Sequence, residues 1–139
     1  INQPTISESI AVVLTAKIKR SKIMIIANEK DVHAIVMESP EVKNAAMKAL
    51  ISPKEGWDGY VMRVVELAQG GYSPRHAHEW PHINYILEGH GSLHVDGKDT
   101  PVEAGSYAYV PAGTRHQYRN EGNGTFRFIC IVPQEGHVV

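Results

Sequence analysis

The chain is poor in cysteine and in long apolar segments. Cys130 is the only cysteine among its 139 residues, which excludes an internal disulfide and favours a reducing compartment. No apolar run approaches the ~20 residues that a membrane span requires. Residues 10–16 are apolar but too few, and they lack the basic start and cleavage site of a signal peptide. We therefore expect a cytoplasmic protein with no membrane partner.

Net charge is also nearly absent. Fourteen basic residues oppose fifteen acidic ones, for a formal charge of −1. Neither a basic face nor a helix-turn-helix pattern is evident, so we expect no nucleic-acid partner. The hydrophobic share of 42% and the length of 139 residues suit one globular domain. A small-molecule substrate is the remaining kind of partner to expect.

The second half of the chain has the pattern of a β protein. Six short segments rich in β-branched and aromatic residues are separated by turn residues: 60–67, 82–89, 91–95, 106–111, 115–120 and 125–133. The pair Asp96-Gly97 predicts a two-residue hairpin, because glycine adopts positive φ without penalty. Strands at this regular spacing predict an all-β sandwich or barrel.

The first half is ambiguous. Thr5 and Glu8 have capping-box spacing, and an apolar stripe follows, so a helix over about residues 6–19 is one interpretation. The same segment contains residues that suit strands. Residues 41–52 fit either a helix or an early strand.

Three histidines crowd residues 73–82, namely His76, His78 and His82. His78 and His82 satisfy the H-E-x-x-H pattern of zinc proteases, but that pattern requires a helix, and Pro81 disfavours one. On strands, His76 and His78 share a face and His82 begins the next strand. With His116 as a fourth candidate, these imidazoles can converge on one divalent metal. The alternative is that all four are hydrogen-bonded core residues, which costs several kcal/mol unless they are satisfied.

Two spaced motifs carry a family resemblance. The first, G-x5-H-x-H-x3-H-x6-G, is formed by Gly70, His76, His78, His82 and Gly89. The second, G-x5-P-x-G-x2-H-x3-N, is formed by Gly105, Pro111, Gly113, His116 and Asn120. They resemble the two signature motifs of the cupin superfamily, with His82 standing where the usual pattern has glutamate. The chain is thus similar to small, single-domain, four-histidine cupins.

This resemblance implies a fold and a division of the chain. Cupins have a conical jelly-roll β-barrel with the metal near the middle of the pocket. The similarity covers about residues 36–136, so we expect an N-terminal extension at residues 1–35 and a cupin β-barrel at residues 36–139. The four remaining histidines are interpreted as ordinary surface or turn residues: His33, His90, His94 and His137.

The pocket lining follows partly from strand parity. Asn84 and Ile86 share a face with His82, and Tyr118 shares one with His116. On the last strand the parity is open, but the resemblance favours Phe126, Phe128 and Cys130 as the inward set. Cys130 is equally well explained as a small buried hydrophobe. Arg63 is a candidate anion anchor in the pocket, although arginine is more often exposed. The predicted pocket residues are Asn84, Ile86, Tyr118, Phe128, Cys130 and Arg63.

The resemblance implies one divalent transition metal per chain, with manganese or iron favoured and zinc, nickel, copper or cobalt also possible. Four neutral ligands leave the full 2+ charge on the metal, which favours anionic or oxygen-donor ligands. The first hypothesis is a dioxygenase-type oxidoreductase. The alternatives are a non-redox isomerase or lyase acting on a sugar acid or small carboxylate, and a non-catalytic ligand-binding protein.

The last strand, residues 125–133, is apolar at both parities except for Arg127. A strand buried on both faces needs cover outside the barrel. A second copy of the chain is the simplest cover, so we expect a homodimer.

Overall fold

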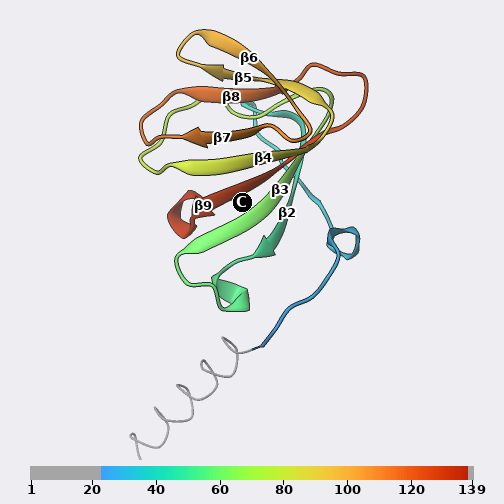
Figure 1. The fold of residues 1–139 in the computed structure, drawn as a ribbon, viewed down its shortest axis with the longest axis vertical. Coiled ribbons are helices and arrows are strands. Elements are labelled where there is room, and N and C mark those ends of the chain that lie inside the picture. The colour runs from blue at the N-terminus through green and yellow to red at the C-terminus, as the bar shows by residue number, and fades with distance from the viewer. Residues whose placement is uncertain (1–22, 138–139) are drawn as a thin grey trace, which may run out of the picture.

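The computed structural model describes residues 23–137, and its regular structure is almost entirely β (Figure 1). The expected helix at residues 6–19 lies outside the described residues. The strands are β1 (Ile35–Val36), β2 (Lys43–Ile51), β3 (Tyr60–Tyr72), β4 (His82–Glu88), β5 (His90–Val95), β6 (Lys98–Glu103), β7 (Tyr107–Val110), β8 (His116–Asn120) and β9 (Phe126–Pro133). Three single-turn 3₁₀ helices are η1 (Glu29–Asp31), η2 (Pro53–Glu55) and η3 (Gln134–Gly136). The all-β expectation is confirmed.

The strands form one curled antiparallel sheet in the order β6-β5-β8-β3-β9-β4-β7, with β2 on β3 and β1 on β2. This is the jelly-roll arrangement. β3 connects the two halves of the sheet, because its residues 60–67 pair with β9 and its last residue, Tyr72, pairs with Arg119 of β8. Gly70, with φ of +76°, lies where β3 bends.

The core lies inside the curl. Burial alternates strictly along β9, and Phe126, Phe128, Cys130 and Val132 all point inward with at most 4% of their surface exposed. The parity that the family resemblance favoured is therefore the observed one. Alternation is the signature of a strand with one face in the core.

Two segments were left open by the sequence. Residues 41–52, which fitted either a helix or a strand, contain strand β2, because their apolar side chains Ala45 and Met47 pack inward against the sheet. β6 was not among the predicted strand segments, since its residues are polar and largely exposed, although the predicted hairpin at Asp96-Gly97 implied a strand there. It is held by main-chain pairing with β5 across the hairpin at Asp96-Gly97, where φ is 48° and 83°.

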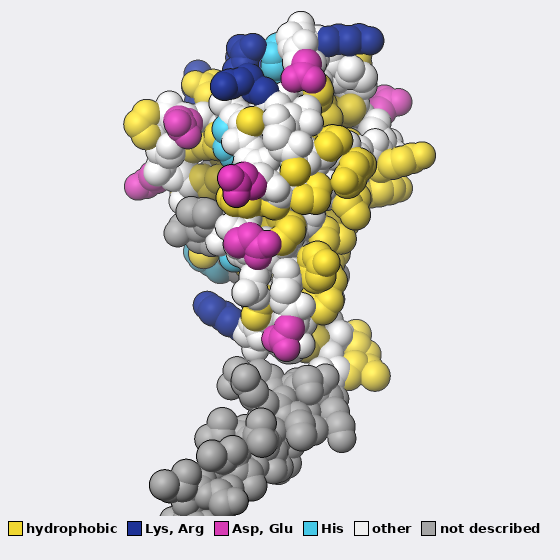
Figure 2. All heavy atoms as spheres, turned by 90° about the vertical axis from the view of Figure 1, so that its left-hand side faces the viewer, with side chains coloured by type: hydrophobic (Ala, Val, Ile, Leu, Met, Phe, Trp, Pro, Cys, Tyr) yellow, Lys and Arg dark blue, Asp and Glu magenta, His cyan; other side chains and the backbone are white. Residues whose placement is uncertain are grey.

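Two features of the outer surface matter below. Hydrophobic side chains gather along one edge of the molecule in Figure 2. Arg127 of β9 projects outward and contacts Glu88 of β4, with Nε 2.9 Å from Oε1, and also Glu29 of η1. Within residues 23–137, no helix is long and apolar enough to cross a membrane.

Candidate metal centre and ligand cavity

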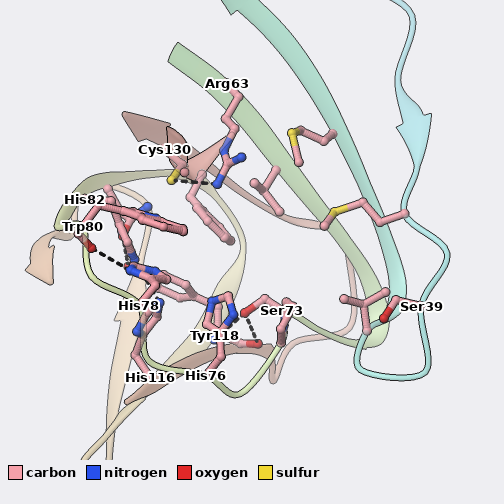
Figure 3. A pocket seen from close by; sticks show the side chains of 18 of the residues that line it. Ser39, Arg63, Ser73, His76, His78, Trp80, His82, His116, Tyr118 and Cys130 are labelled. Carbon is pink, nitrogen blue, oxygen red and sulfur yellow. Dashed lines mark hydrogen bonds between the residues drawn. The ribbon is translucent and has the colours of Figure 1, made fainter. Parts of the chain in front are cut away.

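The four motif histidines line one pocket (Figure 3). His82 and His116 are the first residues of β4 and β8, and His76 forms an isolated bridge with His116. Five pairs of their rings have centroids 4.7–5.3 Å apart. His76 and His78 do not share a regular strand as expected. Their segment lies between Pro74 and Pro81, which cannot donate to a ladder.

The ring nitrogens can hold a metal. One nitrogen each of His76, His78 and His116 lies within 4.8 Å of the others. His82 is not one of these three, but its Nε2 is 2.9 Å from Nε2 of His116. Two ligands at a right angle, each ~2.1 Å from one cation, would be ~3.0 Å apart. The observed spacing therefore fits two neighbouring ligands of a single ion.

Main-chain carbonyls set the tautomers of two rings. Nδ1 of His116 donates to the carbonyl oxygen of Thr114 at 2.8 Å, and Nδ1 of His78 donates to that of Trp80 at 2.6 Å. Each neutral ring then presents an unprotonated Nε2, the form that binds metals. Nδ1 of His82 is buried and has no hydrogen-bond partner within the described structure.

Burial keeps these rings neutral. Burial and, after it, the neighbouring His116 lower the pKa of His76 from 6.5 to about 4. The pKa of His82 falls to about 3 for the same two reasons. Burial also lowers the pKa of His116. At neutral pH the cluster therefore offers lone pairs rather than positive charges.

Trp80 supports the cluster from outside. Its ring stacks on His78 with centroids 4.9 Å apart and an interplanar angle of 8°. Behind it lies Gly136 of η3, where a Cβ atom would meet Nε1 of Trp80 at 2.4 Å. The C-terminal turn therefore holds Trp80 against His78, and only glycine fits there without a shift. The sequence carried no local signal for this contact between residues far apart in the chain.

Next to the histidines, Tyr118 and Asn84 form a buried polar pair. The hydroxyl of Tyr118 donates to Oδ1 of Asn84 at 2.9 Å, and Nδ2 of Asn84 donates to the carbonyl of Ile129. Burial raises the pKa of Tyr118 well above its usual range. The phenol thus remains protonated and serves as a hydrogen-bond donor.

A cavity of about 650 Å³ extends from the histidines across the inside of the sheet. All the predicted pocket residues except Ile86 line it. Ile86 faces inward but lies in the packed core, with 1% of its surface exposed. The rest of the wall comes largely from the first half of the chain, including Ile35, Val36, Met37, Glu38, Ser39, Val42 and Met47. Sequence reasoning missed these residues.

Arg63 reaches the cavity from β3. Its Nη1 lies 3.2 Å from Nδ1 of His137 and its Nη2 lies 3.8 Å from Sγ of Cys130, while Nε is buried without a partner. His137 is thus more than the ordinary surface residue that was expected. His94 differs too, since Arg75 and Asp99 cover it and leave 13% of its side chain exposed.

Comparisons with known proteins agree with this geometry. Residues 63–132 match the cupin domain family. An oxalate-binding protein of Thermotoga maritima is 35% identical over 69 residues, which are 49% of this chain and 57% of that protein. The match therefore spans little more than half of that relative's length.

Solved structures extend the likeness to most of the chain. The polyketide cyclase RemF from Streptomyces resistomycificus superposes with a TM-score of 0.76 at 30% identity, covering 81% of this chain and 80% of the cyclase. A predicted oxalate decarboxylase from Thermotoga maritima has a TM-score of 0.72 at 24% identity, covering 78% of this chain and 98% of that chain. With both motifs, the jelly-roll sheet and the histidine cluster in place, the chain belongs to the cupin family.

Proposed function

We propose that the protein is a metal-dependent enzyme whose four histidines hold one divalent transition metal. The observation that carries this proposal is the convergence of their ring nitrogens, with the Nε2 atoms of His82 and His116 2.9 Å apart. Manganese or iron is favoured because the proposed chemistry is redox. Zinc, nickel, copper and cobalt also suit imidazole ligands.

The favoured reaction is a dioxygenase-type oxidation of a small organic oxygen donor. When bound, the metal would supply a Lewis acid and a redox couple. The chain's own groups do the rest. The histidines orient the site, the hydrogen-bonded pair of Tyr118 and Asn84 forms a fixed polar part of its lining, and the apolar wall excludes water. Among the described lining residues the only carboxylate is Glu38, which is exposed, so a general base is scarce. This scarcity supports oxidation over isomerisation.

A non-redox reaction is the second candidate, as a lyase, an isomerase or a cyclase. The observation in its favour is the 30% identity to a polyketide cyclase across most of the chain. A non-catalytic role is the third, because the name of the Thermotoga relative records binding of oxalate rather than turnover.

The deciding experiment measures metal content and oxygen uptake on the same sample. The protein is purified without added metal, its metals are quantified, and electron paramagnetic resonance is recorded with and without small oxygen donors. Oxygen uptake is then followed with a panel of phenols, enols and carboxylic acids. One manganese or iron per chain and substrate-dependent uptake are expected. His116→Ala should abolish both, while His90→Ala, at an exposed histidine, should change neither.

Other outcomes separate the candidates. Product formed equally well without oxygen would move the assignment to the non-redox reaction. Binding without any product would assign a ligand-binding protein. A protein that takes up no metal would overturn the proposal.

We also propose that two copies pair through the outer face of β4, β7 and β9. Ile83 and Tyr85 of β4 lie opposite Tyr109 and Tyr107 of β7, and the four are 48–82% exposed. Ile131 and Ile129 of β9 continue the surface on the other side. A contiguous apolar patch with tyrosines is typical of an interface. The ion pairs of Arg127 border it as a polar rim.

A further inference from the structure

The cavity is large for the smallest acids that cupin relatives are named for. The six heavy atoms of oxalate fill on the order of 100 Å³, a few times the ~30 Å³ share of one water. The cavity measures about 650 Å³. Pockets of that size usually take ligands of ten or more heavy atoms. A two-carbon acid at the histidines would leave most of the space to water.

One wall of the cavity is apolar and deformable. Met37, Val42 and Met47 line it from the first half of the chain. Met47 is paired with Val65, which is paired with Phe128, so the three lie side by side on the inner face of the sheet. Methionine sulfur makes favourable contacts with aromatic rings and adapts to irregular shapes. A ligand with a flat ring system would bury a face against this wall.

Among the described residues, Arg63 supplies a positive charge without a counter-ion. No carboxylate among residues 23–137 lies within 4.0 Å of its guanidinium, whereas Lys48, Arg119 and Arg127 each have one. Its neighbours are His137, whose pKa is lowered by burial and by the charge of Arg63, and the Cys130 thiol. A partly buried charge in this position is stabilised by an anion that enters the cavity.

The charged group and the metal-binding group are separate. In Figure 3 the guanidinium of Arg63 approaches the cavity from one side, and the rings of His76, His78 and His116 approach it from the other. A ligand that satisfies both needs an acid group and a second oxygen donor, joined by its body. The apolar wall requires that body to be hydrophobic.

From these features we infer that the substrate is an aromatic hydroxy acid with more than one ring. Its carboxylate pairs with Arg63, its hydroxyl oxygen faces the histidines, and its rings lie against the wall formed by Met47, Val65 and Phe128. This inference rests on the proposed function for the role of the histidines. It adds the substrate class and assigns Arg63 as the residue that selects acids.

The test compares three probes on the full-length, metal-loaded protein by calorimetry: 1-hydroxy-2-naphthoate, 1-naphthol and oxalate. The naphthoate should bind at least tenfold more tightly than either of the others. Arg63→Gln should weaken naphthoate binding at least tenfold and leave 1-naphthol within twofold. Arg119→Gln, at an arginine of β8 whose side chain is half exposed, is the matched control and should change nothing.

Equal weakening of naphthoate and naphthol by Arg63→Gln, or no weakening at all, would overturn the role of Arg63. Circular dichroism checks folding, and Arg63→Lys, which keeps the charge, should recover part of the affinity. Tighter binding of oxalate than of naphthoate would overturn the substrate class but leave the metal-dependent function standing. If the protein takes up no metal, the proposed function fails, yet the Arg63 comparison on the metal-free protein still tests the anion anchor.

Discussion

Nε2 of His82 lies 2.9 Å from Nε2 of His116, although 34 residues separate them in the chain. Both residues begin strands, and β4 and β8 are not neighbours in the sheet. The contact therefore crosses the inside of the curl. Both rings have a lowered pKa, so two neutral imidazoles present nitrogen to one point.

The fourth histidine can be tested by truncation. His82→Ala removes one nitrogen but leaves the cluster of His76, His78 and His116. We expect the metal affinity to fall tenfold or more, measured by competition with a chromophoric chelator. An affinity equal to that of wild type would mean that His82 is a core residue rather than a ligand.

The stacking of Trp80 on His78 can be tested by replacing glycines with alanine. Gly136→Ala places a Cβ atom 2.4 Å from Nε1 of Trp80 and must displace the indole. Because supporting residues of this kind typically contribute 10–100-fold to metal affinity, we expect a loss of about tenfold. Gly124→Ala is the control, since nothing lies within 4 Å of a Cβ there. Equal affinities in the two variants would contradict the supporting role.

The buried pair of Tyr118 and Asn84 should contribute to stability. Tyr118→Phe leaves Oδ1 of Asn84 without its donor, which costs about 1–3 kcal/mol of unfolding free energy. Urea denaturation measures the change. Tyr60→Phe, at a residue 48% exposed and outside the proposed dimer face, should alter stability by less than ~0.5 kcal/mol. Indistinguishable midpoints would show that the hydrogen bond is not needed.

The metal-free protein should lose stability in mild acid. The folded pKa values of His76 and His82 are about 4 and about 3, below the usual 6.5. Between pH 6.5 and about 4 the unfolded chain therefore binds more protons than the folded one. The unfolding free energy decreases as the pH is lowered through this range. The urea midpoint in chelator should be lower at pH 5.0 than at pH 7.5. His76→Gln should reduce that difference, and His90→Gln should preserve it.

The apolar outer face of β4, β7 and β9 predicts a dimer, and a single charged substitution in that face should dissociate it. Tyr85→Lys places a charge at the centre of the apolar patch and should convert the dimer to a monomer in sedimentation velocity. Tyr60→Lys is matched, because Tyr60 is also 48% exposed but lies at the end of β3. A wild-type monomer would overturn the proposed dimer, and a dimer unaffected by Tyr85→Lys would place its interface elsewhere.

Local pattern was sufficient for most strands and for the histidine cluster. Alternating apolar residues indicate strands whatever lies beyond them, and Pro81 between His78 and His82 excludes the helix that a protease site needs. The two motifs singled out all four histidines, but strand parity did not describe His76 and His78, whose segment is not a regular strand.

Long-range pairing decided the rest. Residues 41–52 are a strand because β3 offers an open edge, and β6 exists because β5 pairs with it. Met37, Val42 and Met47 reach the cavity only through the pairing of β1 with β2 and of β2 with β3. Arg63 has no carboxylate partner among the described residues, because the register between β3 and β9 places it opposite Cys130. Sequence alone determined which residues could bind a metal, whereas the tertiary structure decided what surrounds them, because a side chain's neighbours depend on strand register between segments far apart in the chain.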